Sequence, residues 1–70
     1  MEPIPVRCRI PDLLHRLGKN QSWLSDMTGI DKYRISEYVN LRSYRISLPR
    51  AVLIAHHLRC SVDDLFEWDI

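Results

Sequence analysis

Residues 21–39 read QSWLSDMTGIDKYRISEYV, and this segment decides how the chain folds. Two short amphipathic stretches meet in it at a single glycine, Gly29. Residues three or four positions apart share one face of a helix. Each stretch carries such a pair, namely Leu24 and Thr28 in the first and Ile35 and Tyr38 in the second. The segment therefore predicts two helices joined by a very tight turn.

Local signals set the ends of both helices. Asn20 and Asp31 stand where a side-chain oxygen can accept from the unpaired N–H groups of the next turn, so they cap helices over about 21–28 and 32–39. Gly29 supplies the positive φ with which a helix often ends. Helices joined this closely cross at a steep angle. This is the geometry of a helix-turn-helix, whose second helix can enter the major groove of DNA.

Three further helices are predicted around this pair. The first covers Pro11–Leu17, where a proline at the first position is harmless. Another begins after its cap, Ser47, and the last begins after Ser61, where Asp64 three residues later resembles a capping box. The core stripe of the helix after Ser47 is predicted to be Leu48, Ala51, Ile54, Ala55 and Leu58.

Both ends of the chain alternate between apolar and polar residues. In VRCRI, residues 6–10, Val6, Cys8 and Ile10 alternate with two arginines, which predicts a short strand rather than an arm along DNA. The segment FEWDI, residues 66–70, alternates in the same way. Because one strand cannot stand alone, we expect a small antiparallel pairing of the two ends, within one chain or across a dimer.

Composition excludes several classes of protein. Seventy residues with an apolar fraction of 46% predict one small domain, residues 1–70. No apolar run approaches the roughly 20 residues that span a bilayer, and the start lacks a signal pattern, so a cytoplasmic, nucleoid-associated protein is expected. Cys8 and Cys60 are expected to be buried thiols. A zinc site at His56 and Cys60 is disfavoured, because a helix is expected to end between them. No nucleophile–base set is present, so we expect no enzyme, cofactor or metal.

Charge is unevenly placed along the chain. Residues 1–59 hold all ten Lys and Arg against five acids, whereas residues 60–70 hold four acids and no base. Between Lys32 and Arg50 there are five basic residues and one acid. This pattern indicates a surface suited to an anionic partner, although charge alone fits an ordinary mixed surface equally well.

Three segments carry a resemblance to a known family: NQSWLSDMTGI (20–30), DKYRISEYVN (31–40) and SLPRAVLIAHHLRCSVDDLF (47–66). In this order they resemble the Cro/phage-repressor (XRE) helix-turn-helix family across residues 10–66. The VRCRI start and the CS-x-DDLF tail resemble a subgroup of small bacterial and phage regulators. The resemblance implies an all-α, five-helix, lambda-repressor-like DNA-binding domain, to which the pairing of the chain ends is added.

The chain departs from the family pattern at four positions. Many members carry an arginine–glutamate ion pair where this chain has Leu14 and Val39. A joint apolar replacement can be neutral or stabilising, so a contact between these two side chains is expected. Leu41 replaces a frequent glycine and predicts a different loop shape. Thr28 replaces a larger apolar residue and is expected to weaken the core slightly.

The resemblance also implies a set of DNA contacts. Since Ile35 and Tyr38 face the core, the opposite side of the 32–39 helix faces outward. The family positions that contact bases correspond to Lys32, Tyr33, Ser36 and Glu37. Phosphate contacts are expected from Asn20, Gln21, Arg34, Asn40, Arg42 and Arg45. Arg34 has the alternative of pairing with an acid on its own surface.

The sequence thus predicts a sequence-specific regulator that binds double-stranded DNA, as a homodimer on adjacent half-sites and as a repressor. The alternative is a protein-interaction module of the same fold, such as an antirepressor or antitoxin-like partner, with weak or no DNA binding. A purely structural domain is the poorest interpretation, because it gives the exposed basic and aromatic residues no purpose.

Overall fold

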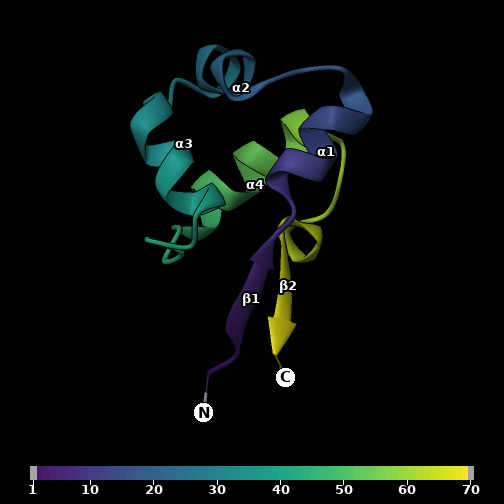
Figure 1. Cartoon of the computed structure of the whole chain (residues 1–70). Coiled ribbons are helices and arrows are strands. Elements are labelled where there is room, and N and C mark those ends of the chain that lie inside the picture. Colours follow the sequence, from purple (N-terminus) through teal and green to yellow (C-terminus); the bar gives the residue numbers. More distant parts are fainter. Residues whose placement is uncertain (1, 70) are drawn as a thin grey trace.

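A computed structural model gives the structure of the chain and describes residues 2–69. Two terminal strands run side by side away from a cluster of helices (Figure 1). The elements in chain order are β1 (Ile4–Cys8), α1 (Ile10–Leu17), α2 (Gln21–Thr28), α3 (Lys32–Val39), α4 (Leu48–Leu58), the 3-10 helix η1 (Val62–Leu65) and β2 (Phe66–Asp69).

The predicted helices are confirmed except for the fifth. The bounds of α2 and α3 agree with the prediction, and α1 begins one residue earlier, at Ile10. Over residues 2–69 there are four α-helices, and the expected fifth is the four-residue 3-10 helix η1. The backbone is already extended at Phe66, so the segment is too short for a ladder of α-helical hydrogen bonds. The expected backward contact of the cap is present, since Ser61 N–H donates to Asp64 Oδ2 at 3.2 Å.

One hydrophobic core unites the helices. α4 packs against α1, α2 and η1, and α2 packs against α3. The largest fully buried side chains are those of Ile10, Leu24, Ile35, Ile54, Leu58 and Leu65. The core stripe of α4 is as predicted with the exception of Leu48, which is 69% exposed. Leu48 is the first residue of the helix, one turn before Ala51, where no described element covers it.

The strands pair antiparallel within one chain. Pro5 lies opposite Trp68 and Arg7 opposite Glu67, so Val6 is an extra residue in a bulge of β1. The predicted N-terminal strand is confirmed, but its alternation is broken at the bulge, where Val6 is exposed and Pro5 is buried together with Cys8. The predicted strand 66–70 extends to Ile70, which lies outside the described residues.

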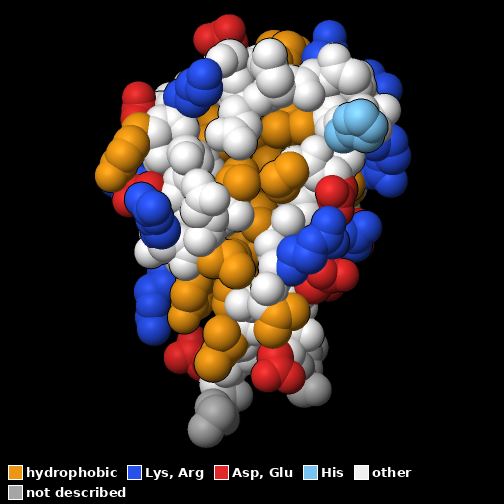
Figure 2. Space-filling view, viewed as in Figure 1, with side chains coloured by type: hydrophobic (Ala, Val, Ile, Leu, Met, Phe, Trp, Pro, Cys, Tyr) orange, Lys and Arg blue, Asp and Glu red, His pale blue; other side chains and the backbone are white. Residues whose placement is uncertain are grey.

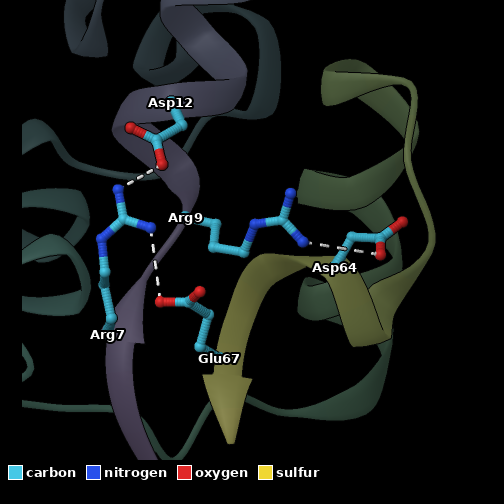
Figure 3. A network of polar contacts seen from close by, with 5 residues as sticks. All are labelled: Arg7, Arg9, Asp12, Asp64 and Glu67. Carbon is cyan, nitrogen blue, oxygen red and sulfur yellow. Dashed lines mark hydrogen bonds and ion pairs between the residues drawn. The ribbon is translucent and has the colours of Figure 1, made fainter.

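Two arginines of the N-terminal segment join the chain ends (Figure 3). Arg7 pairs with Asp12 of α1 and, at 3.3 Å, with Glu67 of β2. Arg9 approaches Asp64 of η1 at 3.9 Å. The hydrogen bond to Asp12 is the largest of the influences that raise the pKa of Arg7. Acidic residues of the C-terminal tail therefore lie beside arginines of the N-terminal segment. These two arginines form ion pairs within the chain.

Buried thiols are confirmed in part. Cys8 is buried and Cys60 is half-buried, and neither forms a disulfide. Loss of solvent raises the pKa of both thiols, which lowers their nucleophilicity at neutral pH. Within residues 2–69 no three His, Cys, Asp or Glu side chains gather as a metal site, and no helix there has the length and apolarity to cross a membrane.

Two non-glycine residues hold a left-handed backbone, Leu41 and Arg59, each with φ of +58°. Leu41 follows α3 and packs against the core, so its burial offsets the strain. Arg59 ends α4 with an exposed side chain and has no such compensation.

We expect Arg59→Gly to raise the free energy of unfolding by about 0.5–1 kcal/mol. Glycine removes the steric cost of the left-handed conformation, while its greater freedom in the unfolded chain cancels part of the gain. Urea denaturation measures the change. The control is Arg16→Gly within right-handed α1, which is expected to lower stability by about 0.5–1 kcal/mol. Equal losses in both variants contradict the argument.

Candidate nucleic-acid interface

The turn between α2 and α3 is built from the predicted caps. Asn20 Oδ1 accepts from Trp23 N–H at 2.9 Å and begins α2, and Asp31 Oδ2 accepts from Tyr33 N–H at 3.1 Å and begins α3. Between them Gly29 has φ of +74°, and its N–H donates to Ser25 O. The two helices are thus separated by three residues, as the helix-turn-helix interpretation predicts.

Two hydroxyl groups hold this turn closed. Thr28 Oγ1 donates to Leu24 O at 2.7 Å and accepts from Ile30 N–H at 3.2 Å. Ser25 Oγ donates to Ile30 O at 2.6 Å. This role of the Thr28 hydroxyl goes beyond the expectation that threonine acts here only as a smaller core residue. A β-branched hydroxyl residue directly before the capping glycine was the signal that could have revealed it.

The core fixes the orientation of α3. Ile35 and Tyr38 are buried, and Arg50 Nη1 of α4 donates to Tyr38 Oη at 3.2 Å. The opposite side of α3 is exposed, and Tyr33 on it is 69% exposed. Lys32 is also exposed and forms no ion pair with any acid in residues 2–69. α3 therefore presents an amine and a phenol to solvent.

The other two predicted base contacts have partners in α3 or at its C-cap. Glu37 pairs with Arg34 at 3.4 Å, which is the alternative foreseen for Arg34. Asn40 Nδ2 donates to Ser36 O at 2.9 Å and to Ser36 Oγ at 3.3 Å. Ser36 and Glu37 are half-buried rather than fully exposed. These contacts depend on which neighbouring side chain is nearest, and helical spacing alone did not decide that.

The predicted phosphate contacts lie at both ends of the helix pair. Asn20 and Gln21 are at the N-terminus of α2, where unpaired N–H groups and the helix dipole favour an anion. Arg42 and Arg45 are exposed in the loop after α3, and neither forms an ion pair in the described part of the chain. The backbone N–H of Arg42 donates to Glu37 O at 2.9 Å, which ties this loop to the end of α3.

A helix-turn-helix on a four-helix core, with the outer face of its second helix exposed, defines a DNA-binding protein. Residues 9–69 match the Cro/C1-type helix-turn-helix DNA-binding domain, and the chain belongs to this family. The chain therefore carries the DNA-binding domain of this family, and the family resemblance inferred from the sequence is confirmed.

Two relatives come from Bacillus subtilis (strain 168). The chain is 36% identical over 64 residues to the SPbeta prophage-derived uncharacterized HTH-type transcriptional regulator YopS, covering 91% of this chain and 86% of that protein. It is 29% identical over 65 residues to the SPbeta prophage-derived uncharacterized HTH-type transcriptional regulator YotL, covering 93% of this chain and 81% of that protein.

We expect Thr28→Val to lower the free energy of unfolding by about 1–2 kcal/mol. Valine keeps the shape of threonine but removes the hydroxyl, so Ile30 N–H loses its acceptor in a partly buried turn. Urea denaturation measures the loss, and hydrogen exchange at the Ile30 amide locates it in the turn. Thr28→Ser keeps the hydroxyl and serves as the control. Unchanged protection of that amide in Thr28→Val rules out the proposed role of the hydroxyl.

Proposed function

We propose that this protein is a sequence-specific repressor that binds double-stranded DNA as a cytoplasmic homodimer, with α3 in the major groove. The observation that carries the proposal is the exposed outer face of α3, where the side chains of Lys32 and Tyr33 have no polar partner in the described residues. A core-facing side made of Ile35 and Tyr38 supports the same orientation. Bound at a promoter, such a protein excludes other proteins from the same DNA, and this is the basis for repression.

Base recognition is assigned to one face of α3. Lys32 can donate to guanine O6 and N7, and Tyr33 can contact a thymine methyl group. Glu37 can accept from cytosine N4 once Arg34 releases it. That release costs little, because an ion pair at the surface of a helix contributes about 0.3–0.5 kcal/mol. Arg34 then becomes available to a phosphate, and Ser36 completes the proposed base-contacting set.

Phosphate contacts would fix the register of α3 without selecting sequence. Gln21 is proposed to present the N-terminus of α2 to one strand, with the amide of Asn20 beside it. Arg42 and Asn40 are proposed to contact the backbone at the other end of α3. The phosphate contact expected of Arg45 is not part of this proposal, because Arg45 borders a groove that also holds the carboxylates of Asp63 and Glu2. The two ends of the helix pair would thereby hold α3 in the groove between them.

The size of the domain supports a dimer. One recognition helix and a few phosphate contacts bury little surface, whereas specific DNA interfaces of regulators commonly use two copies on half-sites one helical turn apart. No cofactor, metal or catalytic step is part of this proposal.

We expect the affinity for duplex DNA to depend steeply on salt. With about four phosphate contacts per subunit, the slope of log affinity against log salt is near −3.6 per subunit. Fluorescence anisotropy with a duplex selected from a random pool measures it. Lys32→Ala is expected to lose about 1–3 kcal/mol of discrimination at one base pair, whereas Arg42→Ala weakens all sequences alike and reduces the slope by about 1.

Arg16→Ala is the matched control for these variants. Arg16 is an exposed arginine of α1 that forms no ion pair in residues 2–69 and belongs to neither contact set, so its removal should change affinity little. Absence of duplex binding at low salt by a dimeric sample contradicts the proposal. That outcome favours the alternative, a protein-interaction module of the same fold.

A further inference from the structure

A groove lies where the two terminal strands meet the loop after α3. Its apolar lining comes from segments far apart in the sequence, namely Ile4 of β1, Trp68 of β2, and Tyr44 and Ile46 of the loop. We call it the terminal groove, and its volume is about 860 Å³. Figure 2 shows hydrophobic side chains over the strands at the lower end of one face and continuing up its middle.

The apolar lining of the terminal groove is left open to solvent. Ile4 is 53% exposed, and Tyr44 and Trp68 are each more than one third exposed. A single exposed apolar residue is ordinary, but several that converge from distant segments mark an interaction surface. Trp68 is also held in place, because its ring packs edge-on against that of Phe66 at 5.6 Å between centroids. A tyrosine and a positioned tryptophan are typical anchors of protein interfaces.

Charges of both signs border the terminal groove. Arg45 stands on the loop, and Asp63 of η1 and Glu2, which precedes β1, supply carboxylates. None of the three forms an ion pair within residues 2–69. The two carboxylates would repel a nucleic acid or a strongly acidic partner. In a two-fold interface every contact between unlike residues occurs twice, so a second copy of the same surface can place each Arg45 opposite the Asp63 of its partner.

We propose that the terminal groove is the surface on which a second copy of this chain docks, with Arg45 of each copy facing Asp63 of the other. This proposal names the contact surface of the homodimer in the proposed function, and it rests on that function for its biological role. Tyr44 lies five residues beyond the end of α3. A partner seated there thus determines where the second α3 stands, and so which spacing of half-sites the dimer fits.

Side-chain docking is favoured over addition of strands between copies. β1 carries a proline, and its bulge interrupts the ladder, so its outer edge is poorly suited to receive another strand. β2 carries Glu67 and Asp69, and antiparallel pairing of two copies of β2 would bring these carboxylates together. Docking of side chains in the terminal groove avoids both the interrupted edge of β1 and the repulsion between carboxylates of β2.

A charge exchange tests the proposal in the absence of DNA. Sedimentation equilibrium of the full chain gives the dimer dissociation constant. Arg45→Glu and Asp63→Lys each place like charges across both symmetric contacts and are expected to raise that constant about tenfold. The double variant restores opposite charges and is expected to return to within about threefold of the unmodified protein. Failure of the double variant to recover contradicts the predicted pairing.

The apolar part of the groove has its own variant and control. Tyr44→Ala is expected to raise the dissociation constant about 30-fold, as for loss of an interface anchor. Leu48→Ala removes a more exposed apolar side chain outside the groove and should leave the constant unchanged. Circular dichroism checks that both variants fold. Equal effects of the two substitutions, or a monomer at all concentrations, overturn the proposal.

Binding to a duplex with one half-site separates this proposal from the proposed function. A monomeric protein that binds the half-site contradicts the docking surface and leaves DNA recognition standing. A dimer that is weakened by the groove variants but binds no duplex supports the docking surface and contradicts DNA recognition.

Discussion

The hydrogen bonds of the Thr28 hydroxyl are the constraint on which the rest of the structure depends. They join the last turn of α2 to Ile30, and the Ser25 hydroxyl adds a further hydrogen bond to the carbonyl of Ile30. α2 and α3 have eight residues each, too few to be stable alone in water. They persist because the closed turn lets Leu24 and Ile35 share the core, and the same angle leaves the outer face of α3 exposed. The burial of the core and the exposure of the face proposed to contact DNA therefore have one geometric origin.

Charged residues at the chain ends pair with one another, whereas several basic residues near the candidate DNA interface form no ion pair in the described part of the chain. The net charge of +1 conceals a basic middle and an acidic tail. In the fold, carboxylates of the tail engage Arg7 and Arg9, while Lys32, Arg42 and Arg45 form no ion pair within residues 2–69. Ser61, above all through its hydroxyl, lowers the pKa of Asp64, so this carboxylate stays charged at any physiological pH. The carboxylates of the tail thus pair with arginines of the N-terminal segment and leave Lys32 and Arg42, the basic residues proposed to contact DNA, without an ion pair in the described residues.

Local chemistry explains what could be predicted from the sequence. Asn20, Gly29 and Asp31 act on backbone groups within a few residues, so the bounds of α2 and α3 followed from short motifs. The exposure of Leu48 and Val6 could not be predicted this way. A helix end left uncovered and a bulge in a strand depend on how distant elements meet.

In the candidate site too, some features could be predicted from local sequence and others could not. The core-facing side of α3 followed from periodicity, because Ile35 and Tyr38 are three residues apart on a short helix. An ion pair of Arg34 with an acid on its own surface was one of two alternatives that the sequence left open. That this acid is Glu37, and that Asn40 binds Ser36, depends on side-chain rotamers, which periodicity does not determine. The contact predicted between Leu14 and Val39 stays a prediction, although both side chains belong to the same core.

The loop after α3 connects the two proposals. It begins at Leu41, whose left-handed backbone turns the chain, and it ends at Ser47, which caps α4 by accepting from Arg50 N–H. Arg42, near its start, is proposed to contact phosphate, and Tyr44, two residues later, lines the terminal groove. Because both ends of the loop are fixed, a partner that binds Tyr44 also restricts Arg42. Docking of a second copy would then order a phosphate contact before DNA arrives, so that less conformational freedom is lost on binding.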